Sequence, residues 1–184
     1  MNIGLDFGTT NSVISYYNEN KILLFQNNNK FLIPSKILIK NDKILYGDQI
    51  KEETEGIIIN NFKINYNKKY LYLGKEYSYK ELIEGYLIYL VELFEKNHCK
   101  IINGVISVPS NFNNHQRNLI SNILKKKFNV IRIINEPSAA VLFHSYKLNL
   151  ESQEIMVIDI GGGTTDISIL EKDEELYEVV ESIG

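Results

Sequence analysis

Two glycine-threonine turns, one near each end of the chain, most constrain what this sequence can fold into. They read Asp-Phe-Gly-Thr-Thr-Asn-Ser at 6–12 and Asp-Ile-Gly-Gly-Gly-Thr-Thr-Asp at 159–166. Each turn follows one apolar, strand-like run and precedes another, so each is predicted to lie at the tip of a β-hairpin. Glycines allow positive φ and close approach of a ligand, and successive N–H groups in such turns bind anions. Two such turns predict a clamp on a polyphosphate.

A single turn of this kind is more often an ordinary tight hairpin, because short glycine-rich motifs match by chance. Two matched copies in the same strand–turn–strand context favour phosphate binding instead. Neither turn has the Gly-Lys-Ser/Thr ending of a Walker loop, and neither runs from a strand into a helix as a dinucleotide-binding turn does.

Composition narrows the class of protein further. The net charge of −3 and the scattered lysines provide no broad basic surface for nucleic acid or a membrane. The single cysteine, Cys99, excludes an internal disulfide and fits a reducing compartment, so we expect a cytoplasmic protein. We also expect no signal peptide and no membrane-spanning segment, because no apolar stretch is long enough.

The remaining pattern predicts a mixed α/β fold. Residues 48–69 show no clear pattern, whereas the other segments divide into strands and helices. Strands are expected at 2–7, 12–17, 21–25, 31–39, 43–46, 105–108, 130–134, 155–159, 167–170 and 176–183. Three helices are expected. The first begins at a capping box at 78–81, the second spans 114–127, and the third begins at 136, with a proline at its first helical position. Alternation of strand and helix after residue 105 implies parallel strands with crossover helices, between two antiparallel meanders.

Four segments resemble the nucleotide-binding domain of the 70-kilodalton heat-shock chaperones of the DnaK type. The glycine turns alone would also fit actins and sugar kinases. Val-Pro-Ser-Asn-Phe-Asn at 108–113 and Asn-Glu-Pro-Ser-Ala-Ala at 135–140 narrow the resemblance to the chaperones. Thr165 departs from the family, which usually has phenylalanine there; this weakens the subfamily assignment rather than phosphate binding. The matching segments are 4–12, 108–117, 132–140 and 159–166.

The resemblance implies a fold and a division of the chain. The fold would be the ribonuclease H-like fold of the actin-like ATPases. Its mixed sheet would combine an antiparallel meander with parallel strands that are joined by crossover helices. Lobe I would span 1–147, with a core subdomain at 1–36 and 102–147 and an inserted subdomain at 37–101. Residues 148–184 would be the incomplete start of lobe II, so the sequence would be a truncated part of a longer ATPase.

The resemblance also implies a role for individual residues in binding ATP or ADP with Mg²⁺. Asp6 would hold the hydrated metal ion, together with Asp159 and Glu136 through water. The catalytic residues would be Asp159, Glu136, Lys63 and Thr164. The phosphate-binding residues would be Gly8, Thr9, Thr10, Asn11, Gly161, Gly162, Gly163 and Thr164. Pro109 and Arg117 would be a switch proline and its relay arginine.

Most of these residues have a simpler alternative. Glu136 could stabilise the start of its helix electrostatically, and Lys63 could be one of many solvated lysines. Arg117 could be a surface helix residue, and Pro109 could merely end a strand.

We therefore expect the chain to be the ATPase portion of a chaperone. Its ATPase activity is expected to be weak or absent in these 184 residues alone. Partners implied by the resemblance are the remainder of the ATPase, a peptide-binding domain, and co-chaperones or an exchange factor. One alternative is a non-catalytic module that binds a partner or itself, because the meander at 155–183 should leave an apolar face and an open edge exposed. A second alternative is an actin-like filament ATPase, which the segment at 135–140 argues against.

Overall fold

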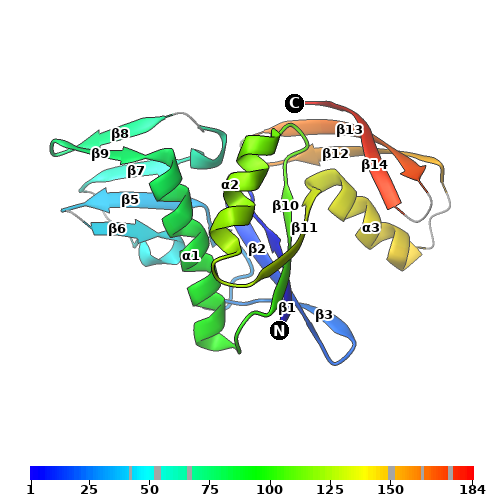
Figure 1. Cartoon of the computed structure of the whole chain (residues 1–184), viewed down its shortest axis with the longest axis horizontal. Coiled ribbons are helices and arrows are strands. Elements are labelled where there is room, and N and C mark those ends of the chain that lie inside the picture. Colours follow the sequence, from blue (N-terminus) through cyan, green and yellow to red (C-terminus); the bar gives the residue numbers. More distant parts are fainter. Residues whose placement is uncertain (42, 52–54, 66–67, 149–151, 163, 174–175) are drawn as a thin grey trace.

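A six-stranded mixed sheet lies at the centre of the molecule (Figure 1). The computed structural model describes residues 1–41, 43–51, 55–65, 68–148, 152–162, 164–173 and 176–184. The strand order is β11-β10-β1-β2-β3, and β4 pairs with β2. The strands are β1 (Asn2–Asp6), β2 (Asn11–Asn18), β3 (Lys21–Leu24), β4 (Ile33–Pro34), β10 (Asn103–Val108) and β11 (Asn129–Asn135). The first three form the predicted antiparallel meander, and β1, β10 and β11 are parallel, so the predicted mixed sheet is confirmed.

Two helices cover one face of this sheet and supply a large part of the core. Helix α1 (Tyr79–Asn97) begins at Ser78, whose Oγ accepts a hydrogen bond from the Glu81 N–H, as the sequence predicts. Helix α2 (Asn114–Leu124) links β10 to β11 and begins with a complete capping box between Asn113 and Gln116. It ends three residues before the predicted boundary of 127, because 125–127 turn back toward β11.

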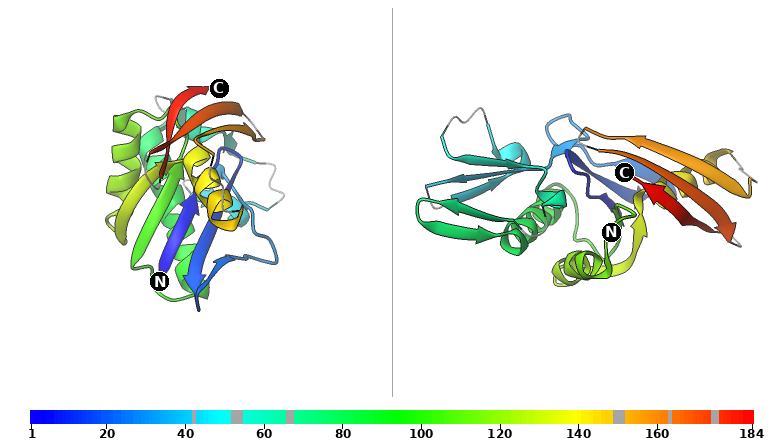
Figure 2. Two further views of the ribbon diagram at one scale, coloured as in Figure 1. Left: turned by 90° about the vertical axis from the view of Figure 1, so that its right-hand side faces the viewer. Right: turned by 90° about the horizontal axis from the view of Figure 1, so that it is seen from above.

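A smaller group of strands packs beside α1 and carries one residue of the site. It contains η1 (Gly47–Gln49) and η2 (Phe62–Ile64), the sheet β6-β5-β7 and the hairpin β8-β9. The strands are β5 (Lys36–Lys40), β6 (Lys43–Tyr46), β7 (Ile57–Asn60), β8 (Lys69–Tyr72) and β9 (Lys75–Ser78). Residues 48–69, which lack a clear sequence pattern, therefore contain β7 and η2. Figure 2 shows this group and the C-terminal sheet on opposite sides of the central sheet.

The C-terminal sheet is the predicted second meander, and helix α3 (Glu136–Leu148) packs against one of its faces. Its strands are β12 (Glu154–Ile160), β13 (Thr165–Asp173) and β14 (Leu176–Ile183), paired in that order. Val141 of α3 packs with Leu170 and Tyr177 on this inner face. The opposite face carries exposed apolar side chains. These are Met156, Ile158, Ile160, Ile167, Ile169 and Ile183.

The prediction of an uncovered meander is thus correct for one face of the C-terminal sheet only. Ile155, Val157 and Val179, which the sequence also marks as apolar, lie on the face that α3 covers. Across the described ranges, no helix is both long and apolar enough to cross a membrane.

Candidate functional site

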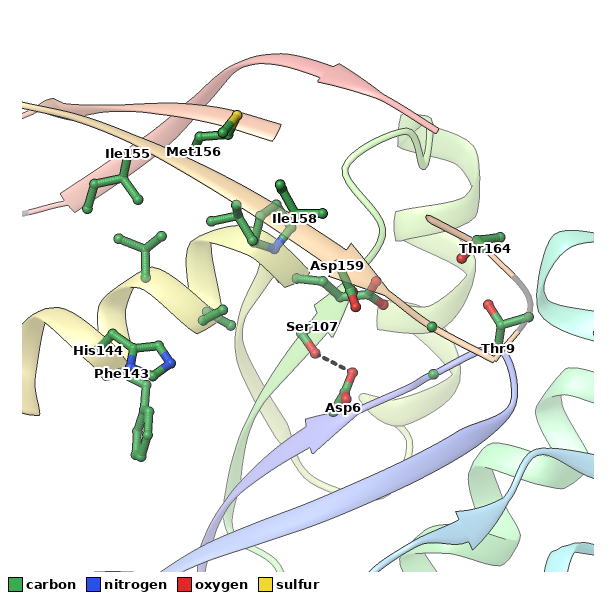
Figure 3. Close-up of a pocket in the computed structure, with 18 of the residues that line it drawn as sticks. Asp6, Thr9, Ser107, Phe143, His144, Ile155, Met156, Ile158, Asp159 and Thr164 are labelled. Carbon is green, nitrogen blue, oxygen red and sulfur yellow. Dashed lines mark hydrogen bonds between the residues drawn. The ribbon is translucent and has the colours of Figure 1, made fainter. Parts of the chain in front are cut away.

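The two glycine turns meet at one side of a cleft, although more than 140 residues separate them in the sequence. A Cβ atom on Gly162 would lie 2.7 Å from Thr10 Oγ1 and 3.1 Å from Thr10 Cγ2, so the second turn rests on the first. Figure 3 shows Thr9 and Thr164 on the adjacent loops. Gly8, Gly161 and Gly162 do not have a positive φ; among the described glycines, Gly47, Gly56 and Gly74 do. Close packing explains glycine at position 162 instead.

The cleft has a volume of about 920 Å³ and runs between the turns, α3 and β12 (Figure 3). It is lined by most of the residues that the sequence predicts for phosphate and metal. These are Asp6, Gly8, Thr9, Thr10, Asn11, Glu136, Asp159, Gly161, Gly162 and Thr164. Gly163 lies outside the described residues. The remaining wall is largely apolar, with Phe143 of α3 and Ile155 of β12 among its side chains.

Asp6 is positioned by the end of β1 and by its parallel neighbour β10. Asp6 and Ser107 are in register, and Ser107 Oγ donates a hydrogen bond of 2.9 Å to Asp6 Oδ1. Desolvation raises the pKa of the Asp6 carboxyl, and this effect outweighs the Ser107 hydrogen bond and the nearby Lys63 charge. The negative charge of Asp159 raises it further. The sequence analysis missed Ser107, although the register of adjacent parallel strands would have placed it beside Asp6.

Asp159 enters the cleft from the other side, at the end of β12. It pairs with Asp166 of β13, just before the second turn. The turn is closed by a hydrogen bond of 2.9 Å from the Gly161 N–H to the Thr164 carbonyl. Asp159 and Asp6 therefore belong to two hairpins that approach the same cleft from opposite sheets.

A buried ion pair joins the strand group beside α1 to the start of α3. Lys63 of η2 is 1% exposed, and its Nζ lies 2.6 Å from Glu136 Oε1. The Phe7 and Phe112 rings flank the same ammonium, at 5.2 and 5.7 Å from Nζ to the ring centroids. The solvated alternative for Lys63 is therefore wrong, and Glu136 does more than stabilise its own helix.

The charges around this ion pair influence one another. Desolvation raises the pKa of Glu136, the Lys63 charge and hydrogen bond lower it, and Asp6 and Asp159 raise it again. Three carboxylates thus line the cleft, and the Lys63 ammonium is bonded to one of them, Glu136. Clusters of titratable groups with shifted pKa values are typical of functional sites.

Arg117 and Pro109 are connected to this cluster through Asn135. The Arg117 guanidinium donates from Nε to the Phe112 carbonyl at 2.9 Å and from Nη2 to the Pro109 carbonyl at 3.2 Å. Nη2 also donates to Asn135 Oδ1, on the residue before Glu136. Arg117 is therefore tied to the loop after β10 and to the end of β11, which the surface-residue alternative does not explain. Pro109 does end β10, as its simpler alternative states.

The carboxylates fit a hydrated cation rather than a bare one. Within the part of the chain that the structure describes, no group of three or more His, Cys, Asp or Glu side chains is placed to hold a metal ion directly. Mg²⁺ usually keeps several water ligands and takes only one or two carboxylates together with substrate phosphates. One or two of Asp6, Asp159 and Glu136, which all line the cleft, would meet that requirement together with water and phosphate.

Comparisons with known proteins agree with this class of fold and site. A family model described as Hsp70 protein matches residues 57–184. The chain is 33% identical over 99% of its length to the chaperone protein DnaK of Ureaplasma parvum serovar 3. It is 35% and 36% identical, over the same share, to the chaperone proteins DnaK of Mycoplasmopsis synoviae and Mycoplasma mobile.

The fold and the site thus define a mixed α/β domain with two apposed phosphate-type turns. The chain belongs to the Hsp70 family and is of the DnaK type. It spans about a third of the length of the curated relatives it matches, 31% of the first of them.

The Lys63–Glu136 pair predicts a distinctive result in a double-mutant cycle. Lys63→Met should lower the free energy of unfolding by about 3–5 kcal/mol, because it leaves the Glu136 charge without its partner in a largely buried place. Adding Glu136→Gln should restore much of this loss, as measured by urea denaturation of the single and double variants.

Lys69→Met is the matched control for this cycle, because Lys69 pairs with Glu76 on the surface, where both side chains are more than half exposed. It should cost no more than about 1 kcal/mol. If the double variant lost as much free energy of unfolding as the two single variants together, the two residues would not be a coupled buried pair.

Proposed function

We propose that these residues form the ATP-binding and ATP-hydrolysing part of an Hsp70-type chaperone. The observation that carries the proposal is that both glycine turns and Glu136 line one cleft, with Lys63 paired to Glu136. A polyphosphate needs many hydrogen-bond donors and compensating positive charge, and these groups supply both.

Phosphate binding is assigned to the backbone and hydroxyl groups of the turns. The first turn contributes Gly8, Thr9, Thr10 and Asn11 from one side. The second contributes Gly161, Gly162 and Thr164 from the other, and Gly163 is proposed with them. Because Gly162 already rests on Thr10, phosphates held by one turn would lie within reach of the other.

Metal binding is assigned to Asp6, Asp159 and Glu136. Bound Mg²⁺ would neutralise charge that develops on the phosphate oxygens during transfer. The three carboxylates would hold it through its water ligands, with Ser107 fixing the orientation of Asp6.

Hydrolysis then requires mainly positioning and neutralisation of charge. Lys63 would place its ammonium beside the terminal phosphate, with Glu136 holding Nζ at 2.6 Å. Asp159 would orient the attacking water and accept its proton, and Thr164 would donate a hydrogen bond from the second turn. Arg117 and Pro109 would relay changes at Glu136, since Arg117 bonds both to the Pro109 carbonyl and to Asn135.

The division into lobes and the actin-like fold are part of the same proposal. Lobe I would comprise 1–147, with its core at 1–36 and 102–147 and an inserted subdomain at 37–101. Residues 148–184 would begin lobe II. The position of the cleft between the central and C-terminal sheets supports this division. The remainder of the ATPase, a peptide-binding domain, and co-chaperones or an exchange factor would be its partners, in the cytoplasm.

Titration calorimetry with Mg-ATP tests the proposal directly. The 184-residue chain should release or absorb heat on binding, and Asp159→Asn should weaken the affinity by about tenfold or more, because a charged contact to the hydrated metal is lost. Asp48→Asn is the matched control: its carboxylate accepts a hydrogen bond from Asn27 Nδ2 outside the cleft, so the affinity should stay unchanged. A folded chain that gives no heat, or equal affinities for both variants, would contradict ATP binding by this site.

A second candidate function is supported by the outer face of the C-terminal sheet. Ile160 is 78% exposed, Ile183 72% and Met156 64%, which is unusual for large apolar side chains gathered on one sheet. We infer that this face binds a second copy of the chain.

Sedimentation velocity over a range of concentrations tests self-association. The wild-type chain should form dimers or larger species, and Ile158→Lys should shift it to monomer, because a lysine would be buried without a partner. Leu71→Lys, at a 69% exposed position on β8, should leave the association unchanged. A wild-type chain that stays monomeric at every concentration would rule this function out.

A further inference from the structure

A buried cluster of three hydroxyl groups lies directly behind the first glycine turn. Ser12 of β2, Ser35 after β4 and Tyr86 of α1 form this hydroxyl cluster, and none of them is more than 1% exposed. Ser12 Oγ lies 3.1 Å from Ser35 Oγ and 3.1 Å from Tyr86 Oη, and Ser35 Oγ lies 3.2 Å from Tyr86 Oη. Buried hydroxyls are costly unless they are hydrogen-bonded, so this arrangement holds the three side chains in place.

The hydroxyl cluster ends on the backbone of the turn. Ser35 Oγ donates a hydrogen bond of 2.8 Å to the Gly8 carbonyl, and the Ser35 N–H donates one of 2.8 Å to the Thr10 carbonyl. Every hydroxyl can donate within this arrangement: Tyr86 to Ser12 or to the Pro34 carbonyl at 3.2 Å, Ser12 to Ser35, and Ser35 to Gly8. Bonds in such a chain strengthen one another.

Tyr86 is suited to start this chain. Desolvation by burial raises the pKa of Tyr86, so its hydroxyl stays protonated and can donate. Its ring packs against Phe7 and Phe62, at 6.0 and 5.1 Å between centroids, and these residues are the neighbours of Asp6 and Lys63. Tyr86 therefore supports the site through its ring as well as through its hydroxyl.

The bonds from Ser35 fix two peptide planes of the turn. In a planar trans peptide, the carbonyl and the following N–H point in opposite directions. Because the Gly8 and Thr10 carbonyls point toward Ser35, the N–H groups of Thr9 and Asn11 point away from it. Gly8, Thr9, Thr10 and Asn11 all line the cleft, whereas none of the three residues of the hydroxyl cluster does.

We propose that Ser35, held by Tyr86 and Ser12, is a positioning residue that orients the Thr9 and Asn11 amides toward the phosphates of the nucleotide. The inference rests on the proposed function, since the phosphates are those of ATP. Donors oriented before the ligand arrives need no reorganisation when it binds, which increases their contribution to affinity.

Three single variants test this role. Ser35→Ala removes the donor to the turn, and Tyr86→Phe removes the first hydroxyl while keeping the ring. Tyr89→Phe is the matched control on the same helix, because its hydroxyl accepts a hydrogen bond from the Asp48 N–H, away from the turn. Two quantities are measured: the affinity for Mg-ATP by calorimetry, and the ¹⁵N order parameters of residues 8–11 in the ligand-free protein.

Ser35→Ala should lower the affinity for Mg-ATP by about tenfold and Tyr86→Phe by about threefold, as expected for lost buried hydrogen bonds. Order parameters at 8–11 should fall in both variants and not in Tyr89→Phe, with those at 161 and 162 unchanged. A merely structural role would lower global stability without a local change at the turn.

The outcomes separate this inference from the proposed function. If the wild-type chain binds no Mg-ATP, the proposed function fails, and the order parameters alone decide whether Ser35 positions the turn. Unchanged order parameters at 8–11 in both variants would overturn the inference, as would Mg-ATP affinities equal to that of Tyr89→Phe. If Ser35→Ala does not fold, Tyr86→Phe carries the test.

Discussion

The buried ion pair between Lys63 and Glu136 is the interaction on which the rest of the site depends. An ammonium that is 1% exposed needs a partner, and Glu136 at the start of α3 supplies one at 2.6 Å. The pair therefore ties the strand group that carries η2 to the central sheet and to the helix beneath the C-terminal sheet. It also places a positive charge near Asp6 and Glu136, which offsets part of the repulsion among the three carboxylates.

Helix α1 has a comparable role on the other side of the turn. Tyr86 completes the hydroxyl cluster behind Gly8, and Tyr79 Oη donates a hydrogen bond of 3.1 Å to the Lys63 carbonyl. One amphipathic helix thus supports both the first phosphate-type turn and the lysine. The core that stabilises the fold and the contacts that shape the site are largely the same contacts.

The hairpins, the capped start of α1 and the parallel strands were predictable, because each depends on residues close together in the sequence. The Lys63–Glu136 contact was not predictable from patterns, since 73 residues separate the partners and a lysine in a weakly patterned segment resembles a solvated one. The resemblance alone pointed to Lys63. The need for a glycine at position 162 comes from its packing on Thr10, a contact between segments far apart in the sequence. The hydroxyl cluster joins three distant elements and left no signal in the sequence.

Amide chemical-shift mapping during a titration with Mg-ADP tests the central claim most directly, because it reports on both turns in one experiment. A two-sided clamp requires the amides of Thr9, Thr10 and Asn11 to shift together with those of Gly161, Gly162 and Thr164, along one binding curve. Shifts confined to one turn, or curves with different midpoints for the two turns, would contradict a single phosphate site built from both.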